Sequence, residues 1–232
     1  DGGKGWKIKY FKGLGTSSSK EFKQYFKNKK MVTFKYEGDT CSDSIDKVFN
    51  KHRADDRKKW LGNYDKDEVL NSDTSNITYT DFVDKEMKHF SKYDCDRSIP
   101  NVIDGWKIST RKILYSCFKR NLTNEIKVAQ LAGYVSEHSG YHHGEMSLIK
   151  SIIGMAQEFV GSNNANVLMP NGQFGTRLMG GKDHASERYI FTALNPLTKF
   201  IFRDEDKAIL NYNNDDGLKV EPEYYLPIIP FA

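Results

Sequence analysis

The chain has 232 residues, of which 38% are hydrophobic and 28% are charged, and its net charge is +4. This length fits one large domain or two small ones, and the composition is ordinary for a soluble protein. Because no window approaches about 18 consecutive apolar residues, we expect no membrane span and no role as a membrane protein.

The charge is unevenly distributed along the chain. Residues 1–60 carry 16 Lys and Arg against 8 Asp and Glu, and residues 97–190 carry 11 against 7, whereas residues 61–96 carry 4 against 9. Two basic blocks separated by an acidic one indicate two surfaces that meet a polyanion. For any single block, a solvated charged face would give the same pattern.

The cysteines and the chain ends give two further expectations. Cys41, Cys95 and Cys117 are widely spaced and odd in number, which predicts reduced thiols in an intracellular protein. The sequence starts without Met or a signal peptide and stops in an apolar run, so we expect an internal part of a longer protein.

The first 61 residues predict short strands and helices. Residues 12–15 form a glycine turn between a strand and a helix, a geometry that can hold phosphate on backbone N–H groups. Ser18 stands three residues before Glu21, the spacing of a capping box, and predicts a helix that ends at about Lys27. The other elements expected here are strands over 6–11 and 31–36 and helices over 44–51 and 54–61.

Residues 62–79 are rich in Asn, Asp, Ser and Thr and predict a loop or a weakly ordered linker. Thr80 and Asp81 can cap a helix that ends at about Phe90. We therefore expect a connection between two parts of the chain.

From Arg97 the apolar residues follow a helical spacing. Ser98 predicts a short helix with Pro100 near its start and Gly105 at its end. Further helices are expected over 109–120, 124–138 and 145–160, with a break at Gly140 and a strand over 166–169. Two helices joined by a short glycine-containing turn and followed by a strand and a glycine-rich hairpin are typical of a winged-helix domain. The residues expected to point inward are Ile113, Leu114, Cys117, Phe118, Val128, Leu131, Ala132, Val135, Ile149, Ile152, Ile153, Ala156 and Val160.

The rest of the chain predicts a strand over 190–194, a helix over 196–202 and a hairpin over 208–221 with its turn at 213–217.

The stretch 170–192 combines repeated glycines with positive charge. Arg177, Lys182 and Arg188 supply the charge, and Tyr189 follows directly on Arg188. A phenol beside a guanidinium can attack a phosphodiester while the guanidinium stabilises the charge that develops on the phosphate. A polar surface hairpin anchored by Tyr189 would give the same local sequence.

A series of longer motifs decides between these alternatives. The chain contains KGLGTS (12–17), DDRK (55–58), RSIP (97–100), DG (104–105), VAQLAG (128–133), YHHGE (141–145), GQFGTR (172–177), RYIF (188–191) and YLPIIP (225–230). In this order, the motifs resemble those of eukaryotic-type type II DNA topoisomerases, and the resemblance covers nearly the whole chain.

The resemblance implies an α+β fold with four regions. These are the C-terminal part of a Toprim α/β domain over 1–61, a helical linker over 62–96, a winged-helix domain for DNA binding and cleavage over 97–194, and the start of a tower domain over 195–232. It further implies that the whole protein passes one duplex through a transient double-strand break in another, as a homodimer and in the nucleus.

The resemblance also implies roles for individual residues. Tyr189 would form a phosphotyrosyl intermediate with the 5′ end of the cut strand, and Arg188 would stabilise the transition state. The other residues that it places at double-stranded DNA are Arg97, Lys107, Arg111, His142, His143, Arg177 and Lys182. Solvated cations would explain Arg97, Lys107 and Arg111 equally well, and a helix cap would explain the histidines. The family has Pro-Gly-Gln before the residue that matches Arg111, whereas this chain has Ile108-Ser109-Thr110.

The family uses Mg²⁺ and ATP, and we expect both to bind outside these residues. Two acidic motifs, at 37–39 and 94–96, are similar to the family's magnesium ligands but follow the KGLG turn instead of preceding it. We therefore predict no metal site in this chain. Two alternatives stay open on the sequence: a winged-helix module that only binds DNA, and a tyrosine recombinase, against which the glycine-rich hairpin argues.

Overall fold

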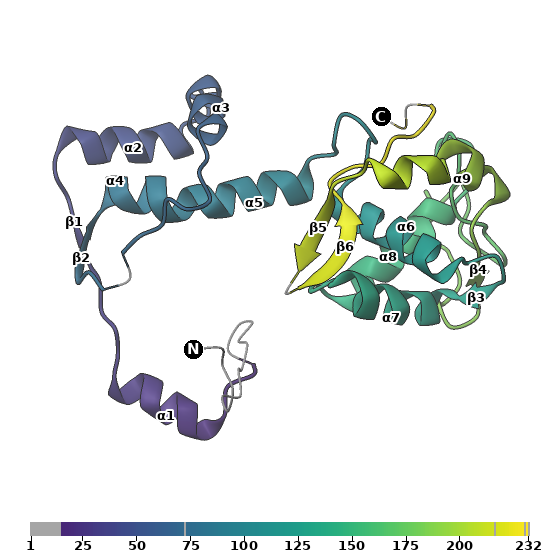
Figure 1. The fold of residues 1–232 in the computed structure, drawn as a ribbon, viewed down its shortest axis with the longest axis horizontal. Coiled ribbons are helices and arrows are strands. Elements are labelled where there is room, and N and C mark those ends of the chain that lie inside the picture. Colours follow the sequence, from purple (N-terminus) through teal and green to yellow (C-terminus); the bar gives the residue numbers. More distant parts are fainter. Residues whose placement is uncertain (1–14, 72, 216, 230, 232) are drawn as a thin grey trace. The chain divides into compact units, whose positions relative to one another are not determined.

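The structure, a computed structural model, describes residues 15–71, 73–215, 217–229 and 231, and it divides into two compact units, residues 1–90 and 91–232 (Figure 1). The strand predicted over 6–11, and the turn at 12–15 except for Gly15, lie outside the described residues.

The first unit begins with the predicted capping box. Ser18 Oγ accepts a hydrogen bond from Glu21 N at 3.4 Å, and Ser18 N donates to the Glu21 carboxylate at 2.6 Å. These reciprocal bonds satisfy two N–H groups that the helix itself leaves unpaired, so α1 spans Ser19–Lys27 as predicted. The elements that follow are β1 Thr33–Lys35, α2 Asp39–Phe49, α3 Ala54–Gly62, β2 Asn76–Thr78 and α4 Tyr79–Phe82.

The segment predicted as a loop over 62–79 contains a strand. β2 pairs in parallel with β1, with Phe34 opposite Ile77, and the Phe34 ring packs against Tyr79 and Phe82 at centroid distances of 5.2 and 5.3 Å. The pairing depends on a strand about 40 residues away, so the local composition of 62–79 could not indicate it.

The helix that follows β2 is longer than predicted. Thr78 caps it by accepting from Asp81 N at 2.9 Å, and it continues through a π-helical turn, η1 Val83–Met87, into α5 Lys88–Ser98. The predicted end at Phe90 and the predicted new helix at Ser98 are both wrong. The helix ends just before Pro100, because a residue that precedes proline avoids the helical conformation.

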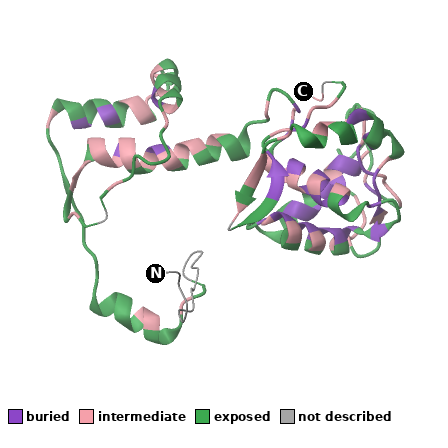
Figure 2. Ribbon diagram, viewed as in Figure 1, coloured by how far each residue is buried: buried purple, intermediate pink, exposed green. Residues whose placement is uncertain are grey.

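Three helices of the second unit enclose its core. α6 Ile108–Arg120, α7 Val128–Ser139 and α8 Glu145–Ala156 pack against one another, and the buried residues concentrate on their facing sides (Figure 2). The predicted inward positions of α6 and α7 are confirmed, since Ile113, Leu114 and Leu131 are completely buried. Val160 is an exception, because α8 ends four residues earlier and leaves this side chain 72% exposed.

Two elements of the second unit differ from their predicted bounds. β3 Ile126–Lys127 pairs antiparallel with β4 Phe191–Thr192, so α7 starts at Val128 and not at Asn124. The strand predicted over 166–169 is reduced to a single bridge between Leu168 and Leu194.

The last part of the chain folds back on the second unit. Its elements are α9 Pro196–Ile201, the 3₁₀ helix η2 Asp204–Ala208, and the hairpin of β5 Tyr212–Asp215 and β6 Leu218–Pro222. The rings of Phe202 and Phe231 lie 5.1 and 5.4 Å from that of Trp106. Residues after 194 therefore share the core of residues 97–194. The α+β fold class is confirmed, whereas the winged-helix assignment and the bounds of the four predicted domains stay predictions.

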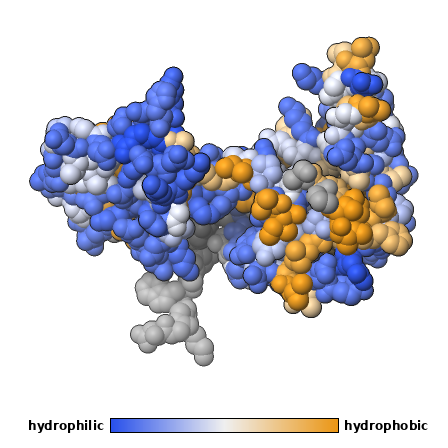
Figure 3. Space-filling model, turned by 90° about the horizontal axis from the view of Figure 1, so that it is seen from above, coloured by the Kyte–Doolittle hydropathy of each residue, from blue (hydrophilic) through white to orange (hydrophobic). Residues whose placement is uncertain are grey.

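All three thiols are free, as predicted, and burial raises the pKa of the Cys117 thiol to about 12. Within the described ranges, the structure has no helix with the length and apolarity needed to cross a membrane. Apolar side chains reach the surface of the second unit (Figure 3).

Candidate functional site

Tyr189 is an exposed side chain on a well-anchored backbone. Its phenol is 72% exposed, whereas the next residue, Ile190, is 1% exposed and belongs to the core. The Arg188 guanidinium, also exposed, lies 5.8 Å from the centre of the Tyr189 ring. The tyrosine and the arginine therefore face solvent together, as a nucleophile and a charge-stabilising group for a polymeric substrate would have to do.

The start of α7 holds the backbone around Tyr189. The N–H groups of Val128 and Ala129 donate to the carbonyls of Ile190 and Glu187 at 3.1 and 3.2 Å. The first N–H groups of a helix have no partner inside it, so these carbonyls satisfy donors that would otherwise be unpaired. Two such bonds, one on each side of Tyr189, fix the position of the segment that carries the phenol.

Arg177 and Lys182 lie on a folded loop that precedes Tyr189. The Asp183 carboxylate accepts from both the N–H and the hydroxyl of Thr176, each at 2.8 Å. The Thr176 N–H is also the main cause that lowers the pKa of Asp183, because it stabilises the ionised carboxylate. Arg177 and Lys182 are exposed and have no ion-pair partner in the part of the chain that the structure describes.

A second group of predicted residues meets in one cavity of about 610 Å³. Arg97 comes from the end of α5, Lys107 precedes α6, and His142 and His143 lie on the turn between α7 and α8. Neither Arg97 nor Lys107 has an ion-pair partner among the residues described. The structure thus brings four of the predicted DNA-binding residues together. Tyr189 and Arg188 do not line this cavity.

Both histidines of the turn are hydrogen-bonded by residues that the sequence analysis did not select. His142 Nε2 lies 2.7 Å from the Asp215 carboxylate, and His143 Nε2 lies 3.2 Å from the hydroxyl of Tyr93. Burial lowers the pKa of His143, and the positive charge of Arg97 lowers it further. In the free protein, therefore, the environment of His143 favours the neutral ring.

Arg111, predicted to contact DNA, is part of the interior. Its side chain is 4% exposed, and its Nε and Nη2 donate to the two carboxylate oxygens of Asp104 at 2.7 and 3.1 Å. Nη2 also donates to the carbonyl of Trp106 at 2.9 Å. Such a guanidinium cannot reach a phosphate without breaking a buried ion pair. The structure therefore supports a structural role for Arg111, and we remove it from the candidate DNA contacts.

The two acidic motifs have local roles. Asp94 and Asp96 lie on α5, where Asp94 accepts from the Ser98 hydroxyl and Asp96 pairs with Lys92. Asp39 is the first residue of α2. Among the described residues, no three His, Cys, Asp or Glu side chains come together as a metal site would require. Because contacts within α5 already engage the carboxylates of Asp94 and Asp96, these two residues do not fit the Mg²⁺ of the family, and no step is assigned to it.

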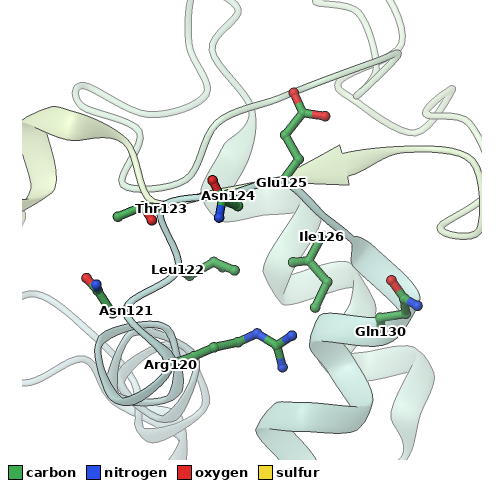
Figure 4. A pocket seen from close by; sticks show the side chains of 8 residues that line it. All are labelled: Arg120, Asn121, Leu122, Thr123, Asn124, Glu125, Ile126 and Gln130. Atoms are coloured by element: carbon green, nitrogen blue, oxygen red, sulfur yellow. The ribbon is translucent and has the colours of Figure 1, made fainter.

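A further polar cavity of about 490 Å³ lies between the end of α6 and the start of α7 (Figure 4). The Arg120 guanidinium lies 4.8 Å from the centre of the Tyr134 ring, and Glu125 points away and accepts from the Asn171 side chain at 2.9 Å. None of the predicted site residues line this cavity.

The sequence analysis missed Tyr93, Lys112, Asp215 and Glu221, which also line the cavity of the histidines. Tyr93 precedes Arg97 by four residues on α5, so the two share a helix face; recognising one continuous helix over 79–98 would have indicated this. Lys112 pairs with Glu221 at 2.7 Å, and both side chains are largely buried. A pair separated by 109 residues leaves no local signal in the sequence.

Comparisons with known proteins assign both halves of the chain to families. Residues 97–232 match the model for the A subunit of DNA gyrase/topoisomerase IV, and residues 1–95 match that for the C-terminal associated domain of TOPRIM. The chain is 56% identical over 230 residues to DNA topoisomerase 2 of Plasmodium falciparum, covering 97% of this chain and 16% of that protein. It is 52% identical over 243 residues to human DNA topoisomerase 2-alpha, covering 99% of this chain and 16% of that protein.

The crystal structure of the Plasmodium falciparum topoisomerase II DNA-binding, cleavage and re-ligation domain is similar, with a TM-score of 0.81 at 56% identity. That match covers 97% of this chain and 31% of the other. The chain thus spans about 16% of the length of these two curated relatives.

Proposed function

This chain belongs to the DNA gyrase/topoisomerase IV family of type II DNA topoisomerases, and we propose that it forms part of a DNA gate that cuts and rejoins duplex DNA through Tyr189. The observation that carries this proposal is the geometry at Tyr189. A phenol that is 72% exposed stands beside an exposed arginine, on a backbone that two hydrogen bonds from the start of α7 hold in place.

The proposed reaction is a reversible transfer of a phosphodiester. Tyr189 Oη attacks the phosphorus, a new O–P bond forms, and the bond from phosphorus to the 3′ oxygen breaks. The phenol loses its proton and the 3′ oxygen gains one, which leaves the 5′ end of the cut strand attached to the protein. Because the tyrosyl ester keeps the energy of the broken bond, the 3′ hydroxyl can reverse the reaction without a further source of energy.

Arg188 is the group proposed to stabilise the transition state. A guanidinium is always protonated at physiological pH, so it cannot serve as a base, but it can bind the extra negative charge on the phosphate as the phenol attacks. Arg97, Lys107, His142, His143, Arg177 and Lys182 would bind the phosphates of the DNA backbone. These contacts carry no sequence information, so we expect binding with little sequence preference.

The whole enzyme requires parts outside this chain. We propose that those parts bind Mg²⁺ and ATP, that the enzyme is a homodimer with one Tyr189 for each DNA strand, and that it acts in the nucleus. ATP would drive passage of a second duplex through the break.

The replacement of Tyr189 by phenylalanine in the full-length enzyme tests the proposal. The ring and its packing stay, and one hydroxyl is lost, so folding and DNA binding should stay nearly unchanged while the covalent adduct disappears. Cleavage complexes are trapped with denaturant, and protein attached to the 5′ end of the cut strand is measured. Tyr134→Phe is the matched control, because the Tyr134 ring stacks on His138 within α7 and makes no hydrogen bond through its hydroxyl to any described residue.

The same experiment addresses the main alternative, a module that only binds DNA. If the wild-type enzyme forms no adduct, Arg188 and Tyr189 only contact phosphate; if the adduct persists in Tyr189→Phe, another residue is the nucleophile. A tyrosine recombinase, the third possibility considered, finds no support in the family to which the chain belongs.

A further inference from the structure

We call residues 174–183 the apical loop. One side chain from outside this loop holds its first and last parts together. Gln157, the first residue after α8, donates from Nε2 to the carbonyl of Phe174 at 2.8 Å and to the carbonyl of Gly181 at 3.2 Å. The two carbonyls lie at opposite ends of the apical loop, so a single carboxamide closes it.

The packing under this amide requires glycine on both limbs. Gly175 and Gly181 have φ angles of +98° and +77°, in the region that favours glycine. A Cβ atom at Gly175 would lie 2.5 Å from Gly181 Cα, and one at Gly181 would overlap the Gln157 amide. The limbs therefore pack backbone against backbone, with the Gln157 amide directly against Gly181.

The segment that leads into the apical loop, residues 171–173, also supports Tyr189. Gln173 accepts from Ala185 N at 2.9 Å, and Asn171 exchanges two backbone hydrogen bonds with Phe191, at 2.9 and 3.1 Å. These bonds flank the segment that carries Tyr189. The Tyr189 phenol makes no hydrogen bond to any described residue. Its position therefore depends on its own backbone and on the contacts that hold residues 171–174 beside it.

We propose that Gln157 is a positioning residue for DNA cleavage. Its carboxamide fixes the carbonyl of Phe174, and Phe174 directly follows Gln173, which pairs with the Tyr189 segment. The same amide fixes Gly181, next to Lys182, so one side chain sets the spacing between the phosphate-binding loop and the nucleophile. This inference rests on the proposed function, because it assigns Gln157 to the reaction at Tyr189.

The test replaces Gln157 in the full-length enzyme. Gln157→Glu keeps the shape of the side chain but substitutes an oxygen that cannot donate to either carbonyl. Gln157→Met keeps the length of the side chain without introducing charge, and it also removes both hydrogen bonds. It tests the proposal even if the Gln157→Glu variant fails to fold. Gln130→Glu is the matched control, because Gln130 lies on α7 beside the polar cavity of Figure 4 and makes no side-chain hydrogen bond to any described residue.

Three quantities are measured for each variant: the rate of adduct formation at saturating DNA, the Kd for DNA, and amide hydrogen exchange over residues 170–190. We expect the rate to fall roughly tenfold, since misplacement of a reacting group by about 1 Å can cost up to 10²-fold. The Kd should change less than about threefold, because the phosphate-binding cations are all kept. Exchange should accelerate in the apical loop and not in α6.

This combination separates positioning from stability. A purely structural role would lower the active fraction and the melting temperature without changing the rate constant of the folded enzyme. A Gln157→Met enzyme that forms adduct as fast as Gln130→Glu overturns the inference, and so does unchanged exchange in the apical loop. The proposed function fails separately, if the wild type forms no adduct or if Tyr189→Phe still forms one.

Discussion

Replacement of Asp104 by alanine should destabilise the second unit strongly. The Asp104 side chain is completely buried, and its oxygens accept four hydrogen bonds: two from Arg111, one from Trp106 N at 3.0 Å and one from Tyr225 N at 2.9 Å. Removal of one partner of a buried ion pair costs about 3–5 kcal/mol, because the other charge stays buried without compensation. The two orphaned backbone N–H groups place the expected loss at the upper end of that range.

Denaturant unfolding of the 232-residue chain measures this loss. Trp106 is the one tryptophan in the sequence of residues 91–232, it is 8% exposed, and it lies next to the pair. With Trp6 and Trp60 replaced by phenylalanine in every variant, its fluorescence reports on the second unit, and the shift of the unfolding midpoint gives the change in free energy. Asp94→Ala is the control: its carboxylate is exposed and, among the residues that the structure describes, it is hydrogen-bonded by the Ser98 hydroxyl alone, so the change should lie within about 0.5 kcal/mol.

A double variant tests whether the two charges act as a pair. Asp104→Ala combined with Arg111→Met should be clearly less destabilised than the sum of the single variants, because the second change removes the unpaired cation. A loss below about 1 kcal/mol for Asp104→Ala, or strictly additive effects, would refute the view that this ion pair holds the unit together.

Three further predictions concern DNA. Arg188→Ala in the full-length enzyme should lower the cleavage rate roughly 10²–10³-fold with little change in affinity, and wild-type cleavage would make the residue purely structural. In salt titrations of DNA binding, Lys182→Met should reduce the magnitude of the slope of log K against log salt by about 0.9, because one phosphate contact is lost. Arg111→Met should leave this slope unchanged. A change of slope in Arg111→Met would show that Arg111 contacts DNA. Burial lowers the pKa of His143 in the free protein and a phosphate favours its charged form, so binding takes up a proton. Affinity at constant salt should therefore rise as the pH falls toward that lowered pKa, and His143→Gln should reduce this rise.

Local signals in the sequence predicted local structure well. Ser18 and Glu21 define the start of α1 because both members of the capping box lie within one helical turn. The spacing of apolar residues from Val128 to Val135 identified the buried face of α7, because that face repeats with the period of the helix. Elements that depend on a distant partner were not predicted, as for β2, which pairs with β1.

In the candidate site, too, the sequence indicated which residues take part but not the packing around them. The resemblance to topoisomerases, and not the charge pattern, selected Arg97, Lys107, His142 and His143, and the structure places these four residues around one cavity. The same resemblance selected Arg111, whose partner lies only seven residues away. Proximity in sequence does not show that a carboxylate is buried, so the ion pair was recognisable only once the packing around Asp104 was known.

The bond between Asp104 and Tyr225 has a consequence for synthesis of the protein. The two residues are 121 positions apart, and a ribosome that adds 5–20 residues per second needs roughly 6–24 s to make the intervening chain. During this interval the carboxylate lacks one of its partners, and the Trp106 ring is not yet covered by Phe231. Nascent chains that stop before Tyr225 should therefore be substrates for chaperones and proteases, even though all three core helices are already complete.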